Sequence, residues 1–147
     1  MRLGEKVRVR FATPDDLDWL TADEAETDPK LQRAYRLSVE LGRTVVAELE
    51  GGLIGCLRFD YFWDRVPCIT VAYVTPREYQ GQGVGRAMLG FVEDFLRGQG
   101  YRQLMSSSDT DAARSQAWHR KMGFKESGLL VGLDPRGTGE LFFLKDL

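Results

Sequence analysis

A short glycine-rich segment between an apolar stretch and an amphipathic stretch is the feature that most constrains this chain. The apolar stretch is Cys68–Val74, and three glycines follow at alternate positions, Gly81, Gly83 and Gly85. Residues Val84–Arg97 then place apolar side chains at helical spacing, the strongest periodicity in the sequence. A strand, a glycine loop and a helix in this order form a cradle for a phosphate or pyrophosphate. Glycine lets the backbone approach the ligand, and the N–H groups of the first helical turn point at the anion.

Two widespread kinds of glycine loop do not fit this segment. A P-loop ends in Gly-Lys-Ser/Thr, whereas Gly85 is followed by Arg86 and Ala87. A Rossmann fingerprint needs its third glycine where this chain has Arg86, and an antiparallel hairpin over residues 44–61 precedes the loop here. A glycine-rich turn that binds no ligand stays open as the alternative.

Composition places the chain among soluble globular proteins. We expect its 147 residues, 1–147, to form a single domain. The net charge of −2 offers no basic stripe for nucleic acid, and no apolar run approaches the length of about 20 residues that a membrane span needs. The N-terminus lacks the apolar centre of a signal peptide. We therefore expect a cytoplasmic protein that binds neither nucleic acid nor membrane.

The cysteines and the single histidine limit metal and redox chemistry. Cys56 and Cys68 lie in apolar runs without disulfide or metal spacing, so we expect both to be reduced and buried in the core. One histidine, His119, and two cysteines cannot supply a histidine-rich or four-thiolate site. The sequence therefore predicts no metal centre.

Hydrophobic periodicity and turn signals predict the element order β-α-α-β-β-β-α-β-α-β-β. The predicted strands cover residues 7–11, 44–49, 53–61, 68–74, 101–106, 124–130 and 139–145. The predicted helices begin near Asp15 and cover residues 30–41, 84–97 and 112–122. Hairpins join the early strands, and the helix after the glycine loop makes one parallel connection. The predicted class is α/β in the α+β sense, with a mixed, mostly antiparallel central sheet, flanking helices and one parallel strand pair.

Two motifs on either side of the longest predicted helix point to a known family. Gln80–Gly85 has the sequence Gln-Gly-Gln-Gly-Val-Gly and follows a strand that ends in Val74-Thr75-Pro76. His119–Phe124 ends a helix in His-Arg-Lys-Met-Gly-Phe. These stretches resemble the Gln/Arg-x-x-Gly-x-Gly/Ala and Tyr-x-x-x-Gly-Phe motifs of the GNAT superfamily of N-acetyltransferases, with histidine in the place of the tyrosine. The predicted element order is also similar to that of the family.

The resemblance implies where a coenzyme binds. In that family the two central strands splay apart after a bulge in the first of them, and the pantetheine of acetyl-coenzyme A (acetyl-CoA) lies in the gap. Backbone groups near the end of the first strand would hold the pantetheine, and N–H groups of the loop and helix would hold the pyrophosphate. The candidate coenzyme-binding residues are Tyr73, Val74, Gln80, Gly81, Gln82, Gly83, Val84, Gly85 and Arg86. A solvated helix position explains Arg86 equally well.

His119 is the candidate catalytic residue. It takes the place of the tyrosine that often protonates the departing thiolate, and imidazole, with a pKa near about 6.5, is capable of that task. The alternative is that His119 only packs beside the coenzyme or hydrogen-bonds it. An asparagine that the family often has seven residues earlier is replaced by Ala112. Asp109 or Asp111 could substitute for it, although helix capping explains both.

The general base and the acceptor are less well defined. The central strand has no carboxylate where many family members have a glutamate, which leaves as candidates Asp60, Asp64, Glu24 and Glu26. A surface position explains each of these acids more simply. Residues 15–28 contain seven acids and no Lys or Arg, which favours a cationic acceptor or simply a solvated helix face. An aromatic acceptor wall, or part of the core, is expected from Tyr61, Trp63 and Tyr73.

The resemblance implies an acetyl-CoA-dependent N-acetyltransferase. A primary amine of a small molecule or peptide would attack the thioester directly in a ternary complex, and backbone N–H would stabilise the oxyanion. The missing strand glutamate and tyrosine leave a non-catalytic CoA-binding or regulatory module as the alternative. Pattern alone does not name the acceptor or the oligomeric state, for which a homodimer is one possibility.

Overall fold

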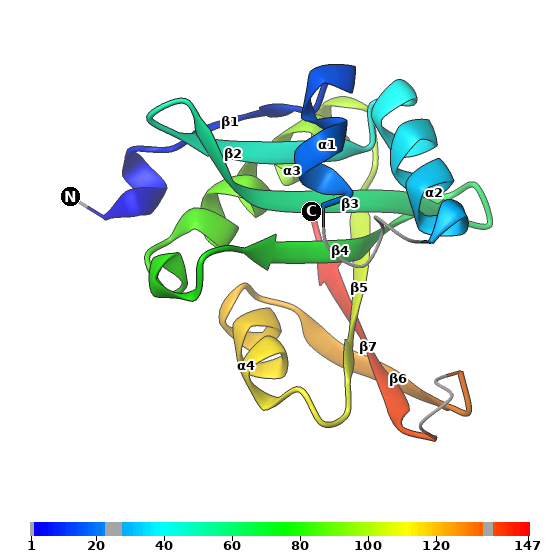
Figure 1. Cartoon of the computed structure of the whole chain (residues 1–147). Coiled ribbons are helices and arrows are strands. Elements are labelled where there is room, and N and C mark those ends of the chain that lie inside the picture. The colour runs from blue at the N-terminus through cyan, green and yellow to red at the C-terminus, as the bar shows by residue number, and fades with distance from the viewer. Residues whose placement is uncertain (1, 23–27, 134–136) are drawn as a thin grey trace.

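The computed structural model describes residues 2–22, 28–133 and 137–147, and it contains one seven-stranded sheet in the order β1-β2-β3-β4-β5-β7-β6. The strands are β1 Arg8–Phe11, β2 Thr44–Leu49, β3 Gly52–Phe62, β4 Val66–Val74, β5 Gln103–Asp109, β6 Lys125–Val131 and β7 Gly139–Asp146. The helices are α1 Leu17–Leu20, α2 Pro29–Glu40, α3 Val84–Gly98 and α4 Ala113–Lys121. Only the β4–β5 pair is parallel (Figure 1), so the mixed, mostly antiparallel sheet is confirmed.

Tight turns with left-handed residues fold the first half into a meander. Glu50 and Gly51 join β2 to β3 with φ of 51° and 84°, the conformation of a two-residue hairpin turn. Trp63 and Asp64 join β3 to β4 with φ of 54° and 57°. The turn is therefore tighter than the sequence indicated, since Val66 and Pro67, predicted to lie in a loop, belong to β4.

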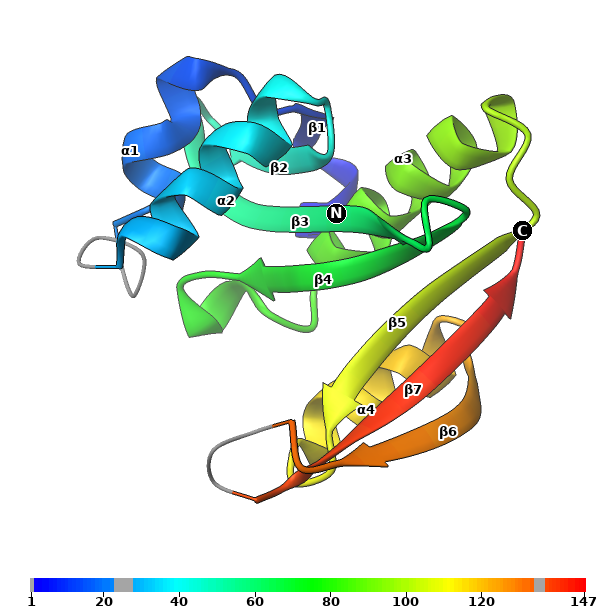
Figure 2. The ribbon, with the colours of Figure 1, turned by 90° about the vertical axis from the view of Figure 1, so that its right-hand side faces the viewer.

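A bulge in β4 opens the sheet at its centre. The β3–β4 register steps from Arg58 opposite Val71 to Phe59 opposite Ile69, which leaves Thr70 as the extra residue. On its other edge β4 pairs with β5 at one position, Cys68 with Met105. Beyond that pair the two strands diverge (Figure 2). The splayed strand pair expected from the family resemblance is therefore present.

Alternating side chains bury two cores, one on each face of β1–β4. α3 covers one face, and its apolar side lies in the larger core with Met88, Val92 and Leu96 almost fully buried. α1 and α2 cover the opposite face, where Leu20 and Tyr35 pack on the smaller core (Figure 1). The sheet between these layers holds the bulge and the splayed edge in position.

The second half of the sheet, β5–β7–β6, carries α4 on one face (Figure 2). β5 extends to Asp109, so Ser107, Ser108 and Asp109, which follow the predicted strand 101–106, are strand residues as well. The first predicted helix, expected from near Asp15, begins at Leu17, because a 3-10 turn over Pro14–Asp16 precedes the four-residue α1. Among the described residues, no helix is both long and apolar enough to cross a membrane.

Candidate active site

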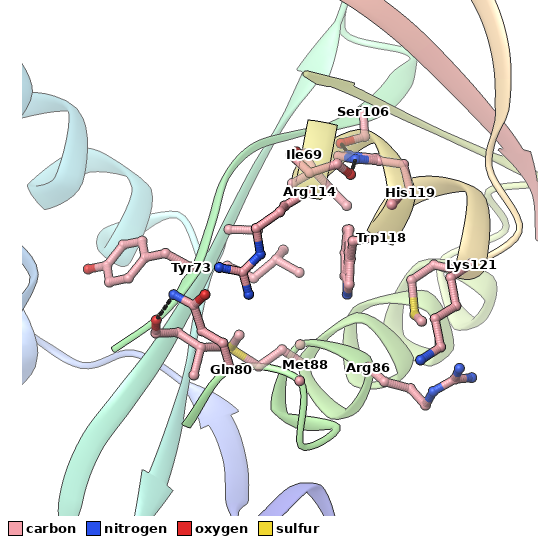
Figure 3. Close-up of a pocket in the computed structure, with 18 of the residues that line it drawn as sticks. Ile69, Tyr73, Gln80, Arg86, Met88, Ser106, Arg114, Trp118, His119 and Lys121 are labelled. Carbon is pink, nitrogen blue, oxygen red and sulfur yellow. Dashed lines mark hydrogen bonds between the residues drawn. The ribbon is translucent and has the colours of Figure 1, made fainter. Parts of the chain in front are cut away.

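A pocket of about 500 Å³ lies where β4 and β5 diverge (Figure 3). Its walls come from β4, from the loop before α3, from the start of α3, from β5 and from α4. The residues predicted to bind the coenzyme that line it are Tyr73, Val74, Gln80, Gly81, Gly83, Gly85 and Arg86. His119, the predicted catalytic residue, also lines it. The structure thus brings the two sequence motifs to one cavity.

The glycine loop presents an uncapped helix start to the pocket. Gly83 is the N-cap of α3 with φ of 87°, and Gly81 has φ of 76°, a region that side chains rarely adopt. No side chain caps the first turn of α3. The N–H groups there have no intrahelical acceptor, so they remain available to an anion, which the positive end of the helix dipole also favours.

The N-terminal segment braces this loop from behind, a contact that no sequence pattern indicated. Gly4 N–H donates to the Gln82 carbonyl at 2.9 Å, and Arg2 Nη2 donates to the Gly81 carbonyl at 2.9 Å. From within the loop, Gln80 Nε2 donates to the Val74 carbonyl at 3.0 Å. These bonds tie down loop carbonyls and therefore hold the loop in one shape.

Two predicted coenzyme-binding residues have other positions. The Val84 side chain is 1% exposed and belongs to the larger core, and the Gln82 amide donates to the Glu78 carbonyl at 2.9 Å. Neither residue is part of the pocket lining. Because these side chains are occupied elsewhere, any contact of Gln82 and Val84 with a ligand would come from their backbone groups.

The charges around the pocket have one sign. Its lining includes the basic residues Arg2, Arg86, Arg114 and Lys121, and no Asp or Glu among the described residues. Figure 3 shows Arg86 and Lys121 at one end of the cavity, and Arg114 on the side nearer Tyr73. Together with the helix N-terminus, this distribution suits a ligand with several negative charges.

His119 is buried, and both of its ring nitrogens have partners. Nδ1 lies 2.7 Å from the carbonyl oxygen of Ser115, and Nε2 lies 2.7 Å from the hydroxyl of Ser106 on β5. The ring stacks on Phe143 with centroids 4.7 Å apart. Burial lowers the pKa of His119, although the bond to the Ser115 carbonyl acts in the opposite direction. Burial therefore favours the neutral form of the imidazole at the wall of the pocket.

Comparison with known proteins identifies the family. The Acetyltransferase (GNAT) family matches residues 11–124, which include the glycine loop and the His119–Phe124 segment. The chain belongs to the GNAT acetyltransferase family. It is 42% identical over 59 residues to an aminoglycoside N(6')-acetyltransferase type 1 of Stenotrophomonas maltophilia, a match that spans 40% of this chain and 38% of that protein.

Solved structures of GNAT proteins share the fold over nearly the whole chain. Ard1 from Thermoplasma volcanium superposes with a TM-score of 0.83 at 16% identity, over 97% of this chain and 98% of that one. A GNAT acetyltransferase from Elizabethkingia anophelis with acetyl-CoA bound has a TM-score of 0.75 at 20% identity, over 97% and 99% of the two chains. At these identities the likeness concerns the fold.

Two of the candidate general bases of this GNAT protein, Asp60 and Asp64, lie away from the pocket. Asp60 is 3.4 Å from Arg43 in an ion pair, and Asp64 lies in the β3–β4 turn. Neither lines the cavity, while Glu24 and Glu26 lie outside the described residues. No described acid lines the pocket. Asp60 or Asp64 could therefore act as the general base only through intervening groups that pass the proton on.

Other predicted residues have structural roles. Asp109 accepts from the Asp111 N–H at 2.8 Å and from the Thr138 hydroxyl at 3.1 Å, so it organises the turn before α4. Of the predicted aromatic wall, only Tyr73 lines the pocket, where it stacks on Trp19 with centroids 5.8 Å apart.

Tyr61 packs instead on Phe59 and Tyr101, and Trp63 is 77% exposed, so neither belongs to an acceptor wall. The cysteine prediction is half right. Both thiols are free, but Cys68 is only half-buried.

Sequence reasoning missed several residues that line the pocket, among them Arg2, Ser106, Arg114 and Trp118. Ser106 stands in an alternating strand, where serine carries no local signal of function. Arg2 precedes the first strand and meets the loop only through the fold, so no pattern in the sequence could have found it.

Proposed function

We propose that this GNAT protein transfers the acetyl group of acetyl-CoA to a primary amine. One observation carries the proposal. The uncapped start of α3 and the glycine loop before it, which the N-terminal segment braces, face a cavity lined by basic residues where β4 and β5 diverge. Pyrophosphate fits the free N–H groups of the loop and first turn, and Arg86 and Lys121 at one end suit further phosphate charge. Bound acetyl-CoA supplies an electrophilic thioester carbonyl next to β4.

The exposed edge of β4 is suited to hold the pantetheine arm. The Thr75 N–H donates to the Ile54 carbonyl in β3 at 2.8 Å. Peptide groups alternate along a strand, so those of Tyr73 also face β3, and those of Ala72 and Val74 face the splay. The Ala72 N–H and its neighbours would therefore bind amide groups of the arm, and Tyr73 would contribute its ring to the acceptor side.

We propose further that the acceptor amine carries a carboxylate or lacks charge. The described pocket lining has no acid to match a polycation such as an aminoglycoside. Two acids of the stretch that favoured a cationic acceptor have structural partners instead. Asp16 pairs with Arg10, and Asp28 caps the start of α2.

Arg58 is the side chain that suits an anionic acceptor group. Its Nε donates to the Thr70 hydroxyl at 3.2 Å, and Thr70 lines the pocket at the bulge. Its buried Nη1 has no hydrogen-bond partner. Arg58 is not itself part of the pocket lining, and its guanidinium also lies 4.0 Å from Asp60 and over the Tyr35 ring. An acceptor carboxylate beside Thr70 would add a further anionic partner to this guanidinium.

Titration calorimetry and a thiol-release assay test the function. We expect acetyl-CoA to bind with micromolar affinity, and Gly83→Val to abolish binding because a β-branched residue cannot adopt φ of 87° without strain. Binding without thiol release over a wide amine panel would favour the coenzyme-binding module. Absence of binding would refute both readings.

Matched pairs of amino acids and their amides test the acceptor class. In the wild-type protein we expect the carboxylate form to have a KM at least about 10-fold lower than the amide, the equivalent of about 1.4 kcal/mol. Arg58→Gln should remove this preference. Faster turnover of polyamines or aminoglycosides than of any carboxylate-bearing amine would contradict the acceptor proposal and leave the acetyltransferase proposal intact.

A further inference from the structure

Ser106 and His119 form a buried pair that reaches the pocket from β5 and α4. The Ser106 hydroxyl is 2.7 Å from His119 Nε2, and both residues line the cavity. Ser106 is 1% exposed and His119 4%, so bulk water does not compete for the hydrogen bond between them. Figure 3 shows the two side chains in contact at one end of the cavity.

The partner of the other ring nitrogen settles which group donates. The Ser115 carbonyl can only accept, so His119 Nδ1 carries the hydrogen. In the neutral ring Nε2 is then a lone-pair acceptor, and the Ser106 hydroxyl donates its proton to it. The Ser115 carbonyl thus fixes the orientation of the ring, and the Ser106 hydroxyl donates to its free nitrogen. In this arrangement a histidine can take up a proton through a hydroxyl group.

The surroundings keep the imidazole neutral until a proton arrives. The groups packed on the ring are Trp118, Phe124, Phe143, the Ser106 hydroxyl and the Ser115 carbonyl. None of them is charged, so no carboxylate stabilises an imidazolium in the resting protein. A proton that reaches Nε2 is therefore held only transiently and is readily returned.

We propose that Ser106 and His119 form a proton relay that serves both halves of acetyl transfer, a proposal that rests on the proposed function. As the amine nitrogen bonds to the carbonyl carbon, it gives a proton to Ser106 Oγ, and the Ser106 proton passes to His119 Nε2. As the carbon–sulfur bond breaks, the departing sulfur takes a proton from Ser106, and Nε2 returns its proton to the hydroxyl. The net result is one proton moved from nitrogen to sulfur.

The relay accounts for two departures of this chain from its family. One neutral histidine supplies a base in a described pocket lining that has no carboxylate, and the same group, once charged, supplies the acid that the absent tyrosine would provide. His119 does not face the sulfur with a free nitrogen, because the Ser106 hydroxyl occupies Nε2. Ser106 is therefore the group that touches the reacting atoms.

Substitutions of two serines on the same face of β5 test the relay. Ser106→Ala should lower kcat about 100-fold, the lower range for a lost acid–base group, while acetyl-CoA affinity by calorimetry changes less than about twofold. Ser106→Thr keeps the hydroxyl and should recover most of kcat. Ser108→Ala is the matched control, because Ser108 is equally buried on the same face of β5 but does not line the pocket.

Nitrogen NMR of the single histidine gives a readout independent of turnover. At pH 7 we expect a protonated Nδ1 and an Nε2 with the shift of a hydrogen-bonded acceptor, which moves toward that of a free lone pair in Ser106→Ala. A proton on Nε2 at pH 7, or Ser106→Ala with wild-type kcat, would overturn the relay.

Three outcomes separate the relay from the transferase proposal. Mass spectrometry that finds an acetyl group on Ser106 during turnover would overturn the relay, because the serine would then be a nucleophile. Thiol release by the wild-type protein together with unchanged kcat in Ser106→Ala refutes the relay alone. Absence of thiol release with every amine, despite coenzyme binding, refutes the relay and the transferase proposal together.

Discussion

The contact between the N-terminal segment and the glycine loop makes Gly4→Ala a sharp test of the cradle. A Cβ built on Gly4 would lie 2.4 Å from the Gly83 carbonyl oxygen and 2.6 Å from its carbon. Real Cβ atoms do not approach a backbone atom closer than 3.0 Å, so the two segments must separate by at least 0.6 Å, the difference between 3.0 and 2.4 Å. A backbone atom cannot rotate away as a side chain does, and the loop itself must therefore shift.

That shift disturbs the hydrogen bonds that shape the cradle. The Gly83 carbonyl accepts the first helical bond of α3, from Ala87 at 3.0 Å, and Gly4 itself donates to Gln82 at 2.9 Å. Bonds lengthened by 0.6 Å lie at the edge of hydrogen-bond geometry. Overpacking of this kind costs about 1–3 kcal/mol. We expect acetyl-CoA to bind about 10-fold more weakly, which corresponds to about 1.4 kcal/mol, and the melting temperature to fall by a few degrees.

Titration calorimetry and thermal denaturation measure the two effects, with Gly90→Ala as the matched control. Gly90 lies within α3, and nothing surrounds the position of its Cβ within 4 Å. Alanine there should stabilise the helix by about 0.5–1 kcal/mol and leave affinity unchanged. A Gly4→Ala protein with wild-type affinity and stability would refute the idea that residues 2–4 brace the loop.

Two stability predictions concern buried charge. The Asp16 carboxylate accepts hydrogen bonds from Arg10 Nη1 at 2.7 Å and from the Thr13 N–H at 2.7 Å. Asp16→Asn should therefore lower the free energy of unfolding at pH 7, measured by chemical denaturation, by about 2 kcal/mol. The bond from Arg10 lowers the pKa of Asp16, so its contribution is complete above the unfolded pKa of about 3.9 and is lost as pH falls through the lower folded value. The difference between wild type and variant should shrink as pH falls below the unfolded pKa, and a constant difference would contradict this account. Lys145 Nζ lies 2.6 Å from Glu93 Oε2 and ties β7 to α3. Glu93→Gln should destabilise by about 3 kcal/mol, and Glu93→Gln with Lys145→Met by less than the sum of the single changes; additive effects would show that the pair is not coupled.

Local chemistry made much of the fold predictable. The period of α3, the Glu50–Gly51 turn and the glycine loop each depend on residues close together in the chain, so the order of the elements along the chain and the position of the glycine loop followed from pattern. Ends of elements were less predictable. Val66, Pro67 and Ser107–Asp109 lie in strands because neighbouring strands supply their partners.

The residues proposed for proton transfer show where prediction from sequence stops. The motif position singled out His119, but the partners of its two ring nitrogens are the Ser115 carbonyl, one turn earlier, and the Ser106 hydroxyl, on another strand. The acid-rich stretch 15–28 suggested a cationic acceptor, yet Asp16 binds Arg10 and the described pocket lining is basic. Burial and pairing decide what a charge does, and both are properties of the packed chain.

The sequence by itself determined the glycine loop and helix start of residues 80–86, because glycine spacing and helical periodicity act within one short segment. The tertiary structure alone decided what surrounds that loop. Arg2 and Gly4 reach it from the N-terminus, and Ser106 and Arg114, from β5 and α4, line the same pocket. Contacts between residues distant in sequence depend on how strands pair and where the sheet opens, which no local pattern records.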